Sequence, residues 1–230
     1  DSLGRSAWNG YGLTETTAGI ITIAGADYAA RPQSCGKAQV LMDVRIADAQ
    51  GETAPIGTPG ELVARGPFVF REYWGKPEAT AEAFFPGGWF RTGDLAMQDK
   101  DGYFTILDRI KDIVVRGGEN ISCAEVEDVA YRYPGVSEAS VLSLPHERLG
   151  EEVALVLALL PGSPAPSHGE VTSFFSDRLS RFKVPSRIFV WPEPELPHGA
   201  TGKTPKREIK KLLLDGKPGV RELISLSAKL

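Results

Sequence analysis

The chain has 230 residues and a formal net charge of −4, with 26 Lys and Arg against 30 Asp and Glu. That balance excludes a general nucleic-acid-binding protein, which needs an excess of basic side chains to neutralise phosphates. Hydrophobic residues make up 42% and charged residues 24% of the sequence, which excludes bulk disorder and is typical of a globular protein.

The first half of the sequence is predicted to be rich in β-strands. Alternating apolar and polar residues predict strands at 40–47 and 60–65. A short helix is predicted at 78–85. Two further strands, at 89–97 and 103–107, flank an Asp-Lys-Asp-Gly run that is typical of a hairpin.

Beyond residue 110 the pattern changes to mixed helices and strands. The predicted strands lie at 113–115, 136–144, 153–160 and 188–191. The predicted helices lie at 124–133, from the Ser167–Glu170 capping box to about residue 181, and at 206–214. We therefore predict an α+β fold with two domains, a β-rich domain at 1–110 and a small mixed α/β domain at 111–230.

The cysteines and the apolar runs indicate the cellular environment. Cys35 and Cys123 are far apart and form no C-x-x-C pair, so neither a disulfide framework nor a zinc site is expected. The longest uniform apolar run, at 153–160, is far shorter than the roughly 20 residues of a membrane helix. We expect no transmembrane segment and a cytoplasmic location.

The run Tyr11-Gly12-Leu13-Thr14-Glu15 combines groups that suit a nucleotide site. An aromatic ring stacks on a base, and a glycine lets backbone approach a ligand. A threonine hydroxyl donates to a phosphate oxygen, and a carboxylate holds Mg²⁺. Taken alone, the same run is also typical of a turn at a strand edge, and both interpretations stay open.

Three later motifs contain candidate residues, and the first two of them allow both a functional and a structural interpretation. Asp94 follows a glycine at a strand end, where its two acceptor oxygens suit the vicinal hydroxyls of a ribose or cap its own turn. Arg109 lies in the charged run Asp-Arg-Ile-Lys-Asp, which is either a solvated loop or a linker whose arginine reaches a nucleotide. Gly117 and Gly118 permit positive φ and leave space for a ligand.

The segment 197–204 partly matches a phosphate-binding P-loop. Gly202, Lys203 and Thr204 fit the end of the G-x-x-x-x-G-K-[ST] pattern, but Pro197 occupies the first glycine position. Proline has no N–H to donate to a phosphate, so a P-loop NTPase is only a weak alternative. Without the P-loop, the segment is predicted to be a loop that presents Lys203. The structural interpretation of this lysine is a side chain that faces solvent.

The order of these motifs resembles the adenylate-forming superfamily of acyl-CoA synthetases, peptide-synthetase adenylation domains and firefly-type luciferases. The resemblance covers about 10–214, and a Phe-Lys-Val-Pro run at 182–185 is more similar to the acyl-CoA synthetases. The motifs that carry it are Tyr11–Glu15, Gly60–Leu62 with Gly66, Arg91–Asp94, Asp108–Asp112, Gly117–Ile121 with Glu125 and Glu127, and Gly202–Lys203.

The resemblance implies that 1–110 is the C-terminal part of a large AMP-binding domain, including a distorted β-barrel, and that 111–230 is a mobile lid. It implies cofactor-binding roles for Tyr11, which would stack on adenine, and for its neighbour Gly12. Thr14 would contact the α-phosphate of ATP, and Glu15 would hold Mg²⁺. The remaining roles in this domain concern the ribose, which Asp94 and Arg109 would bind in a pocket lined by Ile106.

The resemblance also assigns roles to the second domain. Lys111 would be the hinge, Gly117 and Gly118 would lie along the pantetheine of CoA, and Lys203 would be the catalytic lysine. The implied reaction activates a carboxylic acid, fatty or aromatic, with ATP to an acyl-adenylate and pyrophosphate. Attack by the CoA thiol then gives acyl-CoA and AMP, after the lid has rotated about the hinge.

Departures from the family pattern keep alternatives open. The phosphate-gripping loop and the upstream half of the family's sequence are absent, so the implied partner is a missing N-terminal half, and this chain alone is expected to be inactive. Cys123 replaces a usual Pro or Ser, and His198-Gly199 alters the lysine loop. A non-catalytic module that binds AMP or a partner, a carrier-protein thiol as acceptor, and a homodimer remain possible interpretations.

Overall fold

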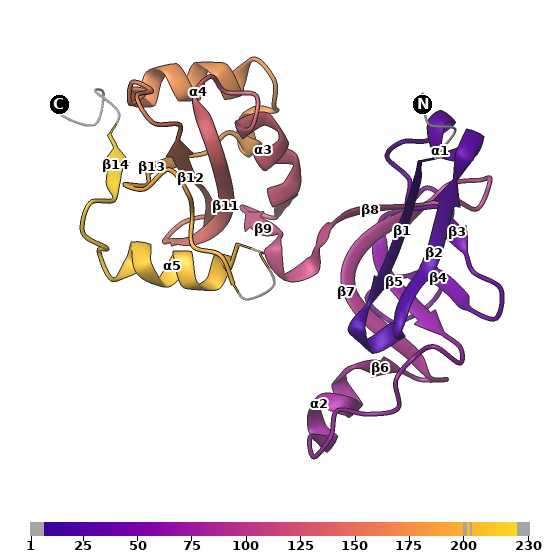
Figure 1. Cartoon of the computed structure of the whole chain (residues 1–230). Helices are drawn as coiled ribbons and strands as arrows, with labels where there is room; N and C mark the ends of the chain where they lie inside the picture. The colour runs from indigo at the N-terminus through magenta and orange to yellow at the C-terminus, as the bar shows by residue number, and fades with distance from the viewer. Residues whose placement is uncertain (1–6, 200–201, 203, 225–230) are drawn as a thin grey trace. The chain divides into compact units, whose positions relative to one another are not determined.

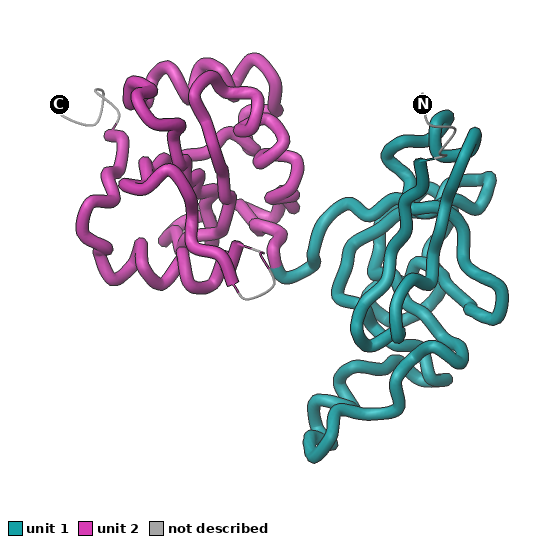
Figure 2. The backbone as a smooth tube through the Cα atoms, viewed as in Figure 1, with its two compact units in different colours: residues 1–111 teal, residues 112–230 magenta. Residues whose placement is uncertain are grey.

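The computed structural model describes residues 7–199, 202 and 204–224. The chain forms two compact units, Asp1–Lys111 (unit 1) and Asp112–Leu230 (unit 2), as Figure 2 shows. Unit 1 consists mainly of antiparallel strands, whereas helices cover the sheet of unit 2 (Figure 1). The α+β fold class predicted from the sequence is confirmed by these elements. None of the helices in the described ranges is long and apolar enough to cross a membrane.

A small antiparallel sheet begins unit 1. Its strands, in spatial order, are β1 (Trp8–Leu13), β2 (Ala18–Ala24) and β3 (Lys37–Ala38). The turn between the first two strands is the 3₁₀ helix η1 (Thr14–Thr16), and a register shift falls between Tyr11 and Gly12. Helix α1 (Gly25–Ala30) follows β2. The motif at 11–15 thus lies at the end of a hairpin.

A second antiparallel sheet makes up the rest of unit 1. In spatial order its path is β4, β5, β7 and β6, and β8 pairs with β7. The bounds of these strands are β4 (Asp43–Ala47), β5 (Gly60–Arg65), β6 (Phe84–Phe85), β7 (Trp89–Gln98) and β8 (Phe104–Arg109). The hairpin predicted around the Asp-Lys-Asp-Gly run is therefore formed by β7 and β8.

Two predicted elements of unit 1 have different bounds in the structure. The predicted helix at 78–85 is α2 (Pro77–Glu82) and stops early, because Phe84 and Phe85 pair with β7 as a strand. The strand predicted from residue 40 begins only at Asp43, after an exposed turn. Apolar residues at 40 and 41 therefore gave a false strand signal.

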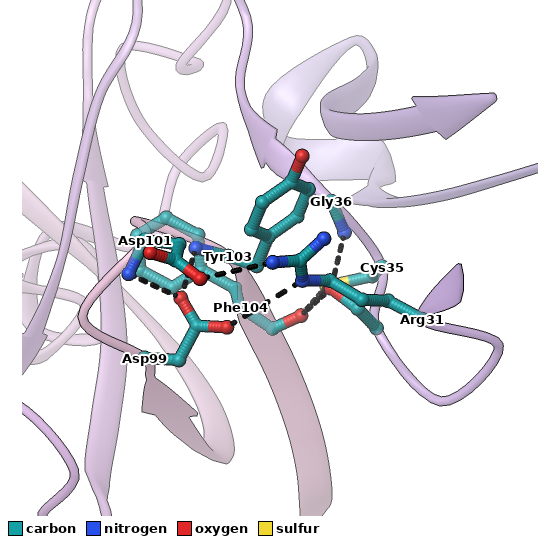
Figure 3. Close-up of polar contacts among 8 residues, drawn as sticks. Arg31, Cys35, Gly36, Asp99, Asp101, Tyr103 and Phe104 are labelled. Atoms are coloured by element: carbon teal, nitrogen blue, oxygen red, sulfur yellow. Dashed lines mark hydrogen bonds and ion pairs between the residues drawn. The ribbon is translucent and has the colours of Figure 1, made fainter. Parts of the chain in front are cut away.

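The segment that joins α1 to β3 is fastened to the start of β8 (Figure 3). The Phe104 carbonyl accepts hydrogen bonds from the backbone N–H and the Sγ of Cys35, at 3.0 Å and 3.2 Å. The Phe104 N–H donates in turn to the Gly36 carbonyl at 2.8 Å. Arg31 Nη2 pairs with Asp101 Oδ2 at 2.9 Å in the β7–β8 turn. These contacts join the two sheets of unit 1.

A six-stranded sheet forms the centre of unit 2. Its path is β10, β9, β12, β13 and β14, with β11 also paired to β12, and only β12 and β13 run parallel. The bounds are β9 (Val114–Arg116), β10 (Glu119–Ile121), β11 (Val136–His146), β12 (Gly150–Leu159), β13 (Arg187–Val190) and β14 (Arg221–Leu223).

Helices cover both faces of this sheet, as Figure 1 shows for α4 and α5. Val153, Leu155 and Leu157 pack with residues of α3 and α4, while Ala154 and Val156 pack with Ile209 of α5. A strand covered on both faces has no polar side, which explains the continuous apolar run at 153–160. The helices are α3 (Cys123–Ala130), α4 (His168–Ser176) and α5 (Lys206–Leu214).

The helix ends of unit 2 match the sequence pattern in part. Ser167 and Glu170 form the predicted capping box at the start of α4. The helix ends at Ser176, five residues before the predicted stop, and the short 3₁₀ helix η3 (Arg181–Lys183) follows. For α5 the predicted bounds are confirmed, and Pro205 occupies the N-cap position.

Candidate functional site

The η1 turn is fixed by one buried threonine. The Leu13 N–H donates to Thr16 Oγ1 at 2.9 Å, and that hydroxyl lies 3.0 Å from the Leu13 carbonyl and 2.8 Å from the Ala18 carbonyl. Thr16 is buried, while Thr14 is exposed and Glu15 is half-buried. In this turn Thr14 is therefore exposed to solvent, and Glu15 remains partly accessible.

The packing of β1 against β2 requires a glycine at position 12. A Cβ added at this position would lie 1.8 Å from the Ala18 carbonyl oxygen on the neighbouring strand. The missing side chain thus lets β1 and β2 approach at the register shift. A ligand-binding role for Gly12 stays a prediction, because the hairpin alone accounts for a glycine here.

The side chains of Tyr11, Asp94 and Arg109 meet in unit 1. The Tyr11 hydroxyl donates a hydrogen bond to Asp94 Oδ2, and Arg109 Nε lies 3.0 Å from Asp94 Oδ1. Asp94 and Arg109 face each other across the β7–β8 pair, whereas Tyr11 comes from β1. The Asp94 side chain is only 5% exposed, so a nearly buried carboxylate is held between a neutral donor and a cation.

The pKa of the Tyr11 hydroxyl is raised well above its ordinary value. Burial is the main cause, and the hydrogen bond to Asp94 adds to it. The phenol therefore stays neutral across the physiological range and keeps donating to the carboxylate. Each Asp94 oxygen still has lone pairs to spare, since a carboxylate offers about four acceptor sites.

Asp94 lies within β7, beside a register shift between β5 and β7, and this stretch is shaped by the contacts of Glu61, Arg91, Thr92 and Gly93. Gly93 has a φ of +73°, in the left-handed region that favours glycine. Its N–H donates to Glu61 Oε1 at 3.1 Å, and Glu61 Oε2 accepts from Arg91 Nε and Nη2 at 3.1 Å and 2.9 Å. Thr92 Oγ1 donates to the Leu62 carbonyl at 2.7 Å and accepts from the Asp94 N–H at 3.2 Å.

Sequence reasoning gave Glu61, Thr92 and Tyr73 no role. Glu61 is buried within a predicted strand, and a charged residue at a buried strand position is the signal that marks it. Tyr73 donates from its hydroxyl to Glu15 Oε1 at 3.0 Å, and no pattern in the sequence indicates that long-range contact.

Ile106 and Lys111 occupy different environments in unit 1. Ile106 pairs with Ala96 across β7 and β8 and packs, partly buried, against the core of unit 1. Lys111 lies in the 3₁₀ helix η2 (Ile110–Asp112) and is the last residue of unit 1. Its position at the unit boundary is compatible with the predicted hinge, which stays a prediction.

The predicted residues of unit 2 lie on a turn rather than in a side-chain cluster. Gly117 and Gly118 join β9 to β10 with φ values of +60° and +90°. A Cβ at Gly118 would meet nothing within 4 Å, whereas one at Gly117 would lie 3.4 Å from Leu149 Cδ2. The predicted catalytic Lys203 lies outside the described residues.

The geometry of unit 1 suits a nucleotide with a cation. A buried carboxylate with spare lone pairs suits two vicinal hydroxyls, and an exposed threonine beside a second carboxylate suits phosphate and a hard cation. Among the described residues, no group of three His, Cys, Asp or Glu side chains would hold a metal alone. A magnesium ion that binds together with a nucleotide commonly uses one or two protein carboxylates, and the substrate phosphates supply other ligands.

Comparisons with known proteins agree with this geometry. The family model described as AMP-binding enzyme matches residues 1–74, and that described as AMP-binding enzyme C-terminal domain matches residues 125–203. A feruloyl-CoA synthase from Amycolatopsis is 41% identical over 202 residues, which are 88% of this chain and 40% of that protein. A 2-succinylbenzoate–CoA ligase from Geobacillus kaustophilus is 38% identical over 210 residues, 91% of this chain and 42% of that protein.

Solved structures show the same similarity. The o-succinylbenzoate CoA synthetase of Bacillus subtilis, in complex with its acyl-adenylate intermediate, has a TM-score of 0.80 at 32% identity and covers 88% of this chain and 40% of its own. ATP-bound MatB from Rhodopseudomonas palustris has a TM-score of 0.81 at 32% identity, with 90% and 41% covered.

The fold of the chain is therefore that of the adenylate-forming enzymes. Two consecutive family models and this set of relatives place it more narrowly: the chain belongs to the AMP-binding enzyme family. It spans about two fifths of the length of the curated relatives it matches. The resemblance stated from the sequence motifs is confirmed.

Proposed function

We propose that the protein containing this chain is an AMP-forming acid–thiol ligase, which activates a carboxylic acid with ATP and transfers the acyl group to CoA. The contact of Asp94 with Tyr11 and Arg109 is the observation that carries the proposal, because it builds a buried acceptor site for a ribose. The relatives include CoA ligases for an aromatic acid and for long-chain fatty acids, which supports either class of substrate.

In this proposal unit 1 binds the nucleotide. Asp94 accepts the two ribose hydroxyls, Arg109 orients it, and Ile106 lines the pocket. The Tyr11 ring stacks on adenine while its hydroxyl keeps the carboxylate in place, and Gly12 lies in the same segment. Thr14 donates to the α-phosphate. Glu15 would hold Mg²⁺, which supplies positive charge to neutralise the phosphates.

The first half-reaction is attack by the substrate carboxylate on the α-phosphorus of ATP. The new bond from carboxylate oxygen to phosphorus forms as the bond to pyrophosphate breaks, and negative charge builds on the phosphate oxygens. Lys203 and the Thr14 hydroxyl would stabilise that charge. The products of this step are the acyl-adenylate and pyrophosphate.

The second half-reaction is attack of the CoA thiol on the acyl carbon. The thioester bond forms, the thiol proton passes to solvent, and AMP leaves. Gly117 and Gly118 would lie along the pantetheine, because their turn exposes backbone without side chains. Rotation about Lys111 would exchange Lys203 for this turn between the two steps. A homodimer and a cytoplasmic location stay predictions.

Replacement of Lys203 tests the proposed division of labour. In the full-length protein, Lys203→Ala should slow the ATP–pyrophosphate exchange that depends on the carboxylic acid substrate. The expected loss is about 10²–10³-fold, as loss of one transition-state donor gives. It should leave thioester formation from a supplied acyl-adenylate unchanged. Lys217→Ala is the matched control, since Lys217 is paired with Glu193 in the same unit and has no proposed role.

Two outcomes would contradict the proposal. An equal loss in both half-reactions would remove the assigned role of Lys203. Binding of AMP by the wild-type full-length protein, with no acid-dependent pyrophosphate exchange for any fatty or aromatic acid, would favour a non-catalytic nucleotide-binding module.

A further inference from the structure

Glu15 is fixed by a segment that carries none of the motifs found in the sequence. Its side-chain Oε1 accepts a hydrogen bond from the Tyr73 hydroxyl at 3.0 Å. Its backbone carbonyl accepts from the Phe70 N–H at 2.8 Å. The segment 70–73 therefore holds both the main chain and the carboxylate of the residue that follows Thr14.

Tyr73 is itself held by its surroundings. Its backbone N–H donates to Thr80 Oγ1 at 3.0 Å, and that hydroxyl donates to the Lys76 carbonyl at 2.9 Å at the start of α2. Its ring centroid lies 4.7 Å from that of Phe70, which packs in turn against Phe84 and Phe90. A tyrosine fixed at both its backbone and its ring presents its hydroxyl in one direction.

This contact leaves the two oxygens of Glu15 in different states. Oε1 is taken by the phenol, whereas Oε2 has no hydrogen-bond partner within the described parts of the chain. A carboxylate bonded through one oxygen loses rotational freedom about its last torsion. The other oxygen then points in a defined direction while its lone pairs remain available to a cation.

We propose that Tyr73 is a positioning residue that orients Glu15 toward the magnesium ion of bound MgATP. The proposal rests on the proposed function and adds to it a residue from outside the nucleotide-binding motifs. Groups that hydrogen-bond to a metal ligand commonly change metal affinity or activity 10–100-fold when they are removed. Tyr73 contacts Glu15 and has no proposed contact with the reacting atoms, so its effect should pass entirely through Glu15.

The main test is the magnesium dependence of the Tyr73→Phe variant in the full-length protein. Removal of the hydroxyl keeps the ring and its packing. We expect the Mg²⁺ concentration for half-maximal pyrophosphate exchange to rise about 10-fold. The KM for the carboxylic acid at saturating Mg²⁺ and the melting temperature should stay within error of the wild type. Tyr28→Phe is the control, because no described hydrogen bond involves the Tyr28 hydroxyl.

A second measurement does not depend on turnover. Mn²⁺ binding to the ATP complex, followed by electron paramagnetic resonance, should weaken about 10-fold in Tyr73→Phe. In a Glu15→Gln background the same substitution should add no further loss, because a residue that acts through another has no effect once that residue is gone.

The outcomes separate this proposal from the proposed function. If the wild type forms acyl-adenylate and Tyr73→Phe leaves both the Mg²⁺ and the Mn²⁺ requirement unchanged, the positioning role is wrong. If Tyr73→Phe and Glu15→Gln lose affinity additively, Tyr73 acts independently of Glu15 and the proposal also fails. If the wild type forms no adenylate, the proposed function fails, while the Mn²⁺ measurement still decides the role of Tyr73.

Discussion

The two units present their candidate residues in different ways. In unit 1 the candidates are side chains held by other side chains, as in the contacts of Asp94 with Tyr11 and Arg109. Among the described residues of unit 2 they are Gly117 and Gly118, which offer only backbone on a tight turn between two short strands.

This difference concerns what each unit requires from its sequence. Unit 1 needs particular functional groups at fixed positions, so changing one group should alter binding even where the fold survives. The turn at Gly117 and Gly118 instead needs a backbone conformation with positive φ, and Gly118 has open space where a side chain would stand. Adding a methyl group there should therefore have a larger effect than its size suggests.

The largest expected effect is that of Asp94→Ala on nucleotide binding. Two hydrogen bonds from ribose hydroxyls to a charged acceptor contribute about 1.5–3 kcal/mol each, so AMP affinity should fall at least about 100-fold. The variant also leaves Tyr11 and Arg109 without their shared partner. Isothermal titration of AMP into the full-length protein measures the change.

Asp43→Ala provides the matched control for that experiment. Asp43 also pairs with an arginine, Arg65, at 2.9 Å, but both side chains are about half exposed. Exposed pairs contribute about 0–1 kcal/mol, so AMP affinity should stay within about three-fold of the wild type. Equal effects of the two substitutions would contradict the assignment of Asp94 and remove the contrast between the units.

The next effect in size is that of Gly118→Ala on the thioester step. An alanine at a φ of +90° costs about 1–2 kcal/mol and should shift the turn, slowing acyl transfer to CoA about 10-fold while adenylation is unchanged. Single-turnover kinetics from a supplied acyl-adenylate measure the step.

Gly162→Ala separates strain from function in the same unit. Gly162 has a φ of +82°, and a Cβ there also meets nothing within 4 Å. Both variants should lose similar stability, whereas only Gly118→Ala should slow the transfer. A Gly162→Ala variant that is equally slow would show that strain in unit 2, not the turn, limits the reaction.

The smallest effect concerns a buried thiol of unit 1. Burial raises the pKa of Cys35 from 9.0 to about 11, and its Sγ contacts the Phe104 carbonyl (Figure 3). Because the folded pKa exceeds the unfolded one, this contribution to stability is complete below about pH 9 and is lost as pH rises toward 11.

Urea denaturation with reductant present tests this pH dependence. The free energy by which the wild type exceeds Cys35→Ala should shrink by about 1 kcal/mol between pH 8 and pH 10. A gap that stays constant with pH would show that the thiol titrates alike in the folded and unfolded chains.

Local chemistry made much of the fold predictable. The strand at 60–65 and the helix at 206–214 have the predicted bounds, and the Ser167–Glu170 capping box was visible as a four-residue pattern. Each of these depends on neighbours in sequence. The early end of α2 does not, because Phe84 and Phe85 become a strand only when β7 lies beside them.

The candidate site also combines residues that local sequence indicates with contacts that only the fold brings about. The sequence indicated Asp94 and Arg109 through their motifs, but it offered two interpretations of each, and only the register of β7 and β8 brings the two side chains together. The hydrogen bond of Tyr73 to Glu15 joins residues 58 positions apart, and no periodicity or spacing records such a contact. Long-range polar contacts of this kind need the three-dimensional fold.

The close approach of β1 and β2 at Gly12 has a practical consequence for mutagenesis. A library randomised across residues 11–15 would recover inactive clones at position 12 for any residue larger than glycine, because the Ala18 carbonyl occupies the space. Those clones would report a hairpin that cannot close, not a lost ligand contact. Engineering of acid or nucleotide preference in this segment should therefore keep position 12 fixed and vary its neighbours.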